Sequence, residues 1–104
     1  MDQEKIQELQ VLERNLQNFS MQRQAFQMEL NEAENALNEI KNSSSDIYKM
    51  TGTIMIKADK EKTVKELEEK KKLLEMRISS IEKQESLVSS NAEKIRKEIE
   101  KDKK

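Results

Sequence analysis

The chain has 104 residues, of which 34% are hydrophobic and 39% are charged, and its formal net charge is −1. A compact globular domain has about half of its residues apolar, so this composition allows either disorder or long helices that each bury one narrow stripe. Cys, His and Pro are all absent, which excludes disulfides and thiolate sites, removes the commonest general base and metal ligand, and leaves no helix-breaking proline.

The same composition argues against several function classes. A net charge of −1 provides no basic surface for nucleic acid. No apolar run approaches the length of a membrane span, and no charged-then-apolar leader opens the sequence. Neither a nucleophile–base pair, nor a glycine-rich phosphate loop, nor a metal-binding cluster is present, so we expect no enzyme activity and no cofactor. We expect one domain over residues 1–104, in a soluble protein of the cytoplasm.

A first helix is predicted over residues 2–42. Taking Leu9 as position a of a heptad, nine of the ten a and d positions are apolar, which meets the coiled-coil criterion and argues against disorder. The cluster from Asn42 to Asp46 favours a turn and ends the helix. The ten a and d positions are Leu9, Leu12, Leu16, Phe19, Arg23, Phe26, Leu30, Ala33, Leu37 and Ile40.

Met21 and Met28 lie outside this stripe, seven residues apart and at the same helical position. Methionine is flexible and polarizable, so the two side chains could form a second, adaptable contact surface. Scattered apolar residues on a protein surface are also normal. The sequence leaves both interpretations open.

A β-hairpin is predicted over residues 47–57, between the two helices. This stretch contains the only tyrosine, Tyr48, and the only glycine, Gly52, which suits a turn near Thr51 and Gly52 because glycine tolerates positive φ. We interpret Tyr48, Met50, Ile54 and Ile56 as an alternating apolar face. A lone two-stranded hairpin is marginal in water, so the hairpin is expected to complete its sheet with other subunits.

A second helix is predicted over residues 60–102, with Asp59 as its N-cap. Counting from Val64, nine of the twelve a and d positions are apolar. The twelve positions are Val64, Leu67, Lys71, Leu74, Ile78, Ile81, Glu85, Val88, Ala92, Ile95, Ile99 and Asp102.

The two helices are expected to fold back on each other as an antiparallel coiled coil. Residues 1–42 contain eight acidic and four basic residues, whereas residues 43–104 contain thirteen acidic and sixteen basic ones. Pairing Ile40 near Val64 makes facing residue numbers sum to about 104. The polar a and d residues Arg23, Lys71 and Glu85 then either pair across the helices and fix the register, or extend to water.

The end of the coiled coil away from the hairpin is predicted to carry a set of apolar residues, here called the terminal set. Helix ends fray, and fraying here would expose leucine and isoleucine side chains. The set is either an ordinary coiled-coil terminus or a mobile apolar tip that binds other apolar chains weakly. Its members are Ile6, Leu9, Val11, Leu12, Ile95 and Ile99.

With a helix, one hairpin and a returning helix in place, the sequence resembles the β-type subunits of prefoldin. The most specific similarity is the Tyr-Lys pair at 48–49, then Gly52, then the apolar strand that follows it. The α-type subunits have two hairpins between their helices, and this chain has room for one. The similarity extends over essentially the whole chain and is carried by residues 31–37, 46–49, 52–57, 60–67 and 77–85.

The resemblance implies a hexamer of two α-type and four β-type subunits (α2β4), whose hairpins form a platform of two β-barrels. It further implies ATP-independent capture of unfolded proteins at the coiled-coil tips and delivery to a group II chaperonin. The oligomerisation residues would be Tyr48, Met50, Gly52, Ile54 and Ile56, and the terminal set would hold clients. The alternative hypothesis is a structural coiled-coil scaffold or tethering protein, whose hairpin would be a passive loop.

Overall fold

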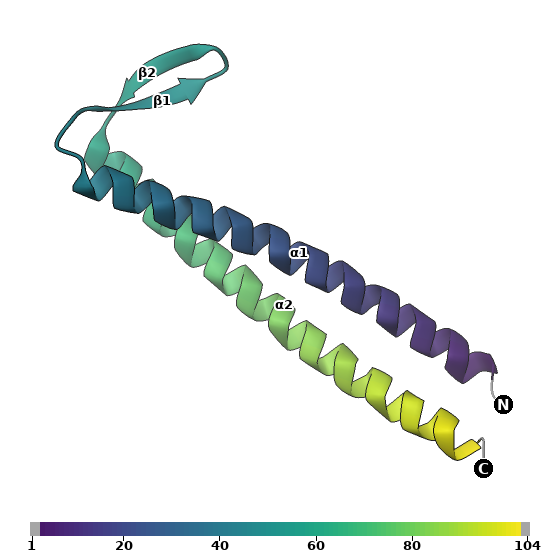
Figure 1. Ribbon diagram of the computed structural model, residues 1–104. Helices are drawn as coiled ribbons and strands as arrows, with labels where there is room; N and C mark the ends of the chain where they lie inside the picture. The colour runs from purple at the N-terminus through teal and green to yellow at the C-terminus, as the bar shows by residue number, and fades with distance from the viewer. Residues whose placement is uncertain (1–2, 103–104) are drawn as a thin grey trace. The chain divides into compact units, whose positions relative to one another are not determined.

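The computed structural model describes residues 3–102 and contains two long helices with a hairpin between them (Figure 1). In chain order the elements are α1 (Gln3–Asn42), β1 (Ile47–Thr51), β2 (Ile54–Ala58) and α2 (Lys60–Asp102). The residues pack as two compact units, which are described separately. The terminal unit contains residues up to 26 and from 77 onward, and the hairpin unit contains residues 27–76.

The bounds of these elements agree closely with the sequence-based expectation. Helix α1 ends at Asn42 and α2 runs from Lys60 to Asp102, as predicted. The predicted start of the first helix, residue 2, lies outside the described residues. Strand β2 continues to Ala58, one residue beyond the predicted end of the hairpin.

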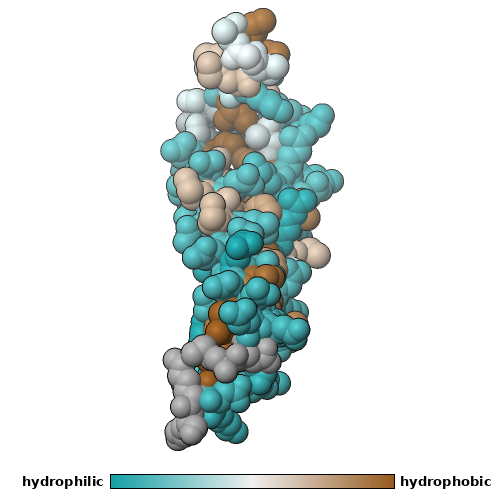
Figure 2. Space-filling model, turned by 90° about the vertical axis from the view of Figure 1, so that its right-hand side faces the viewer, coloured by the Kyte–Doolittle hydropathy of each residue, from teal (hydrophilic) through white to brown (hydrophobic). Residues whose placement is uncertain are grey.

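The heptad stripe forms the seam between the helices in each unit. All ten predicted positions of α1, and all of those of α2 except Asp102, are buried or half-buried. In the hairpin unit the buried side chains are Leu30, Ala33, Leu37 and Leu74, and in the terminal unit they are Ile78, Ile81, Ala92 and Ile95. Apolar side chains are visible between polar ones along the helices in Figure 2.

Local hydrogen bonds define the two junctions with the hairpin. At the end of α1, the Ser43 backbone N–H donates to the Ile40 carbonyl oxygen at 3.3 Å. At the start of α2, the Lys62 backbone N–H donates to Asp59 Oδ1 at 3.3 Å, so Asp59 is the N-cap that the sequence predicted. The Lys60 ammonium donates to the Ser43 carbonyl oxygen, which joins the two junctions.

The hairpin turn consists of Gly52 and Thr53. Gly52 has a φ of 65°, and no other described residue has a positive φ. Positive φ at the first of two loop residues alone is the pattern of a type II′ turn, whose twist matches that of the flanking strands. The only glycine of the chain therefore stands where the turn requires one.

Candidate interaction surfaces

The hairpin carries apolar side chains on both of its faces. The strands pair antiparallel with Met50 opposite Met55 and Thr51 opposite Ile54. Residues directly opposite each other in a sheet point to the same face, and neighbours along a strand point to opposite faces. One face, the methionine face, consists of Tyr48, Met50, Met55 and Lys57. The other face, the isoleucine face, consists of Ile47, Lys49, Thr51, Ile54, Ile56 and Ala58.

This register corrects the interpretation of Tyr48, Met50, Ile54 and Ile56 as a single alternating face. Tyr48 and Met50 lie on the methionine face, whereas Ile54 and Ile56 lie on the isoleucine face. Met55, which the sequence analysis did not include among the candidate residues, is the direct partner of Met50. A strand that is apolar at three successive positions has no alternation, so its sequence cannot show which face each residue occupies.

Neither face is covered within the chain's described part. The exposed fractions are 58% for Tyr48, 68% for Met50, 63% for Ile54, 65% for Met55 and 53% for Ile56. Both strands are also edge strands, because the sheet contains only β1 and β2. Exposed apolar strands with free edges are templates for pairing with other strands. The hairpin is therefore chemically suited to association.

A groove separates the hairpin from the adjoining helix ends within the hairpin unit. It has a volume of about 680 Å³, and its lining includes Ile40, Ile47, Tyr48 and Leu67. Ile47 and Ala58, at the base of the strands, are half-buried, whereas the rest of both strands is exposed. The helices consequently shelter only the base of the hairpin.

Three polar positions of the seam, Arg23, Lys71 and Glu85, take part in ion pairs across the helices, with one pair in each unit. In the terminal unit, Arg23 Nε donates to Glu85 Oε1 at 2.7 Å. In the hairpin unit, Lys71 Nζ lies 3.9 Å from Glu34 Oε1. The hydrogen bond to Glu85, followed by its negative charge, raises the pKa of Arg23 above its usual value. The sequence left open whether these polar side chains pair across the helices or extend to water, and in the structure they pair across the helices.

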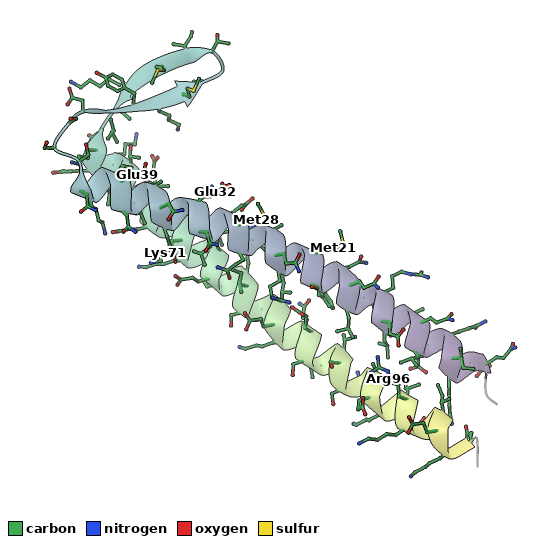
Figure 3. The ribbon with its side chains drawn as sticks, in the orientation of Figure 1. Met21, Met28, Glu32, Glu39, Lys71 and Arg96 are labelled. Atoms are coloured by element: carbon green, nitrogen blue, oxygen red, sulfur yellow. The ribbon has the colours of Figure 1, made fainter. Side chains whose placement is uncertain are left out.

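Further ion pairs connect the two helices. In the terminal unit, Arg96 Nη2 lies 3.2 Å from Glu13 Oε1, and Lys5 Nζ lies 3.4 Å from Asp102 Oδ2. In the hairpin unit, Lys41 Nζ lies 3.2 Å from Glu68 Oε1. Arg96 and Lys71 are labelled in Figure 3. In two of these three pairs the cation lies on α1 and the carboxylate on α2, so the ion pairs do not follow the net charges of the two arms.

We expect Arg23 and Glu85 to specify the register as a pair. Arg23→Glu should lower the melting temperature of the chain, because it places two carboxylates together at the seam. Glu85→Arg should also destabilise, and the double exchange should recover most of the loss because it restores opposite charges. Thermal unfolding followed by circular dichroism, as a double-mutant cycle, measures this coupling. Strictly additive effects of the two substitutions would contradict a register role for the pair.

The terminal set lies mostly in the seam of the terminal unit. Ile95 is only 8% exposed, and Ile6, Leu9, Leu12 and Ile99 are half-buried. Val11 is the one exposed member of the set, at 52%. Both helices are intact over these positions. Five of the six side chains thus belong to the coiled-coil interior when the helices are paired.

Met21 and Met28 lie on the side of α1 that faces away from α2 (Figure 3). Their exposed fractions are 67% and 65%. They belong to different units, and each is surrounded by polar neighbours in the sequence. The structure therefore places both residues on the surface, and their use as a contact surface stays a hypothesis.

No helix in the described part of the chain is long and apolar enough to cross a membrane. Over residues 3–102, no group of three or more acidic side chains is placed to hold a metal ion.

Comparison with known proteins shows which family has this arrangement of two helices joined by one hairpin. A family model described as "Prefoldin subunit" matches residues 3–104. The chain belongs to the prefoldin subunit family. Among curated prefoldin relatives, the β subunit of Sulfurisphaera tokodaii is 38% identical over 52 residues, which is 50% of this chain and 42% of that protein. The β subunit of Thermococcus onnurineus is 36% identical over 53 residues, covering 51% of this chain and 46% of that protein.

The solved prefoldin structures extend the similarity to nearly the whole fold. The prefoldin β subunit of Thermococcus strain KS-1 superposes with a TM-score of 0.86 and 34% identity, over 95% of this chain and 89% of that one. The β2 subunit of the same strain has a TM-score of 0.73 at 20% identity, over 84% of this chain and 95% of that one, a likeness of fold alone. The matched segments cover less than half of the length of the curated relatives named above. The prefoldin fold with a single hairpin is thus the fold of this chain.

Proposed function

We propose that this chain is a β-type subunit of an ATP-independent hexameric co-chaperone, which captures unfolded proteins and delivers them to a group II chaperonin. The hexamer would contain two α-type and four β-type subunits and would act in the cytoplasm, with residues 1–104 as one prefoldin-like domain. The single observation that carries the proposal is the exposed, two-faced apolar hairpin between two paired helices. The family is one of chaperone subunits and not of enzymes.

The hairpin supports the assembly part of the proposal. Two strands alone are marginally stable in water, and this hairpin leaves five large apolar side chains more than half exposed. Hairpins from several subunits would pair their free edges and close into barrels, which removes edges altogether. One face of each hairpin would then fill the barrel interior, and the other would pack against neighbouring parts of the platform.

The terminal set supports the proposed capture of unfolded proteins on one condition, which is that the two helix ends open. Leu9, Leu12 and Ile95 occupy the seam, so they become available to a client only when the two helix ends separate. The ends of helices open at low free-energy cost, because their last turns lack intrahelical partners. Several such ends acting on one unfolded chain would sum weak apolar contacts into useful avidity.

Native mass spectrometry of this chain, alone and mixed with an α-type prefoldin subunit, tests the proposal. A hexamer of two α-type and four β-type chains is expected, and it should suppress aggregation of an unfolded test protein without ATP. A stable monomer or dimer that ignores the α-type chain would overturn the proposal and favour the scaffold alternative.

Val11→Ser should weaken client capture without loosening the coiled coil. Val11 is 52% exposed, so its removal takes away apolar contact surface without leaving a cavity. A loss of about 0.5–1 kcal/mol of client-binding free energy corresponds to a roughly two- to fivefold rise in the concentration of the complex that is needed to suppress aggregation. Light scattering of a denatured client measures this change.

The matched control is Glu8→Ser, an exposed polar residue of the same helix, which should leave capture unchanged. Native mass spectrometry should find both variants in the same hexamer. Unaltered capture by the Val11 variant would exclude Val11 from the client-binding surface.

A further inference from the structure

Two methionines face each other directly across the strands of the hairpin. Met50 pairs with Met55 in the register of β1 and β2, so their side chains share the methionine face. Their exposed fractions are 68% and 65%. Side chains that are directly opposite in an antiparallel pair have Cβ atoms about 4.5–5.5 Å apart. The hairpin therefore presents two open thioethers side by side.

Thioethers in this setting react with peroxides. The sulfur lone pair attacks one oxygen of hydrogen peroxide, the O–O bond breaks, and the products are a sulfoxide and water. The sulfur loses two electrons, and the peroxide gains them. The sulfoxide is polar and chiral where the thioether was apolar, and methionine sulfoxide reductases reverse the change.

We propose that Met50 and Met55 form a paired methionine-oxidation site that controls entry of the hairpin into its assembly. The inference rests on the proposed function, in which the hairpin faces become buried between subunits. In the free chain the pair is open to peroxide. Once oxidised, each side chain would carry an S=O group that binds water. Burial would remove this water, and the lost free energy is recovered only if a hydrogen-bond donor takes its place. Oxidation therefore opposes association.

The position of the pair distinguishes it from the other described methionines. Met21, Met28 and Met76 are 67%, 65% and 69% exposed and lie on helices outside the seam. Oxidation at these three positions leaves the new oxygen in water, so it has no comparable cost. Among the methionines that the structure describes, only Met50 and Met55 lie on a surface that the proposed assembly would bury, so only their oxidation would oppose assembly.

Two sets of substitutions separate these contributions. Met50→Leu with Met55→Leu removes the pair at nearly constant volume. Met21→Leu, Met28→Leu and Met76→Leu together keep the pair and remove the three helical methionines. Each full-length chain is treated with hydrogen peroxide, the excess is removed, and assembly with an α-type prefoldin subunit is followed by native mass spectrometry. Peptide mass spectrometry identifies which methionines have gained oxygen.

Peroxide should raise the concentration for half-maximal assembly by about tenfold or more in the wild-type chain and in the triple variant. The Met50→Leu, Met55→Leu variant should assemble equally well before and after treatment. Methionine sulfoxide reductases A and B together should restore assembly of the wild-type chain. Oxidation at the two positions should also be slower in the preformed complex than in the free chain.

Two failures are distinguishable. If the wild-type chain oxidised at both positions assembles as well as the untreated chain, or if the double variant is impaired equally by peroxide, the oxidation site is wrong and the assembly proposal stands. If the untreated chain forms no complex with the α-type subunit, the proposed function is wrong and the inference fails with it.

Discussion

Ile54→Lys is expected to abolish assembly of this chain with other prefoldin subunits while its helices stay folded. Ile54 is 63% exposed in the single chain, so a lysine there stays in water and costs the free chain little. In an assembly the same position would be buried between hairpins. A buried, unpaired ammonium group costs several kcal/mol, enough to weaken association by at least about a hundredfold.

Native mass spectrometry measures the loss of the complex, and the circular dichroism signal at 222 nm measures the retained helix. Thr53→Lys is the matched control, because Thr53 is exposed and lies in the turn next to Ile54, outside both strand faces. The control should assemble normally. Recovery of an intact hexamer from the Ile54 variant would exclude a platform built on the isoleucine face.

Leu74→Ala is expected to destabilise the coiled coil by about 2–5 kcal/mol, the range for leucine-to-alanine changes in a packed interior. Leu74 is only 2% exposed, and it lies in the seam of the hairpin unit with Leu30, Ala33 and Leu37, which are also buried. Removing its three outer carbon atoms takes away apolar contacts and leaves a cavity that a rigid helix pair can fill only in part. Urea unfolding of the full chain, followed by circular dichroism, gives the change in free energy of unfolding.

The adjacent residue provides a matched control for this substitution. Leu73 is the same residue type in the same helix, yet it is 48% exposed. Leu73→Ala should therefore lower the free energy of unfolding by less than about 1 kcal/mol. Equal losses from the two substitutions would mean that α2 does not present the a and d positions to α1.

The helices and their seam were predictable from sequence because a heptad repeat states which side of a helix is buried. The spacing that begins at Leu9 in the first helix and at Val64 in the second identified the seam positions, of which only Asp102 is exposed in the structure. The same spacing placed Arg23 and Glu85 at seam positions that lie about one helical turn apart in the expected register, and the structure joins them at 2.7 Å. Whether those charges pair or extend to water depends on side-chain geometry, which the repeat does not encode.

The faces of the hairpin were not predictable in the same way. The single glycine located the turn, but the register depends on which two residues form the loop. With Gly52 and Thr53 as the loop, Met55 joins Met50, and Ile54 points to the opposite face. A shift of one residue would exchange these faces, and the successive apolar residues Ile54, Met55 and Ile56 are compatible with either choice. The exposure of the terminal set was also not predictable, because it depends on whether the two helix ends are paired, and the sequence does not show this.

The ion pairs that join the helices of the terminal unit make their pairing sensitive to ionic strength. The side chains in the Arg23–Glu85, Arg96–Glu13 and Lys5–Asp102 pairs are 21% to 46% exposed, so dissolved ions screen them over a distance of about 8 Å at physiological salt. Added salt weakens these contacts, but it does not weaken the apolar seam beneath them. The helix ends should therefore open more readily as salt rises, and a client that binds to opened ends should be held more tightly in a saltier medium.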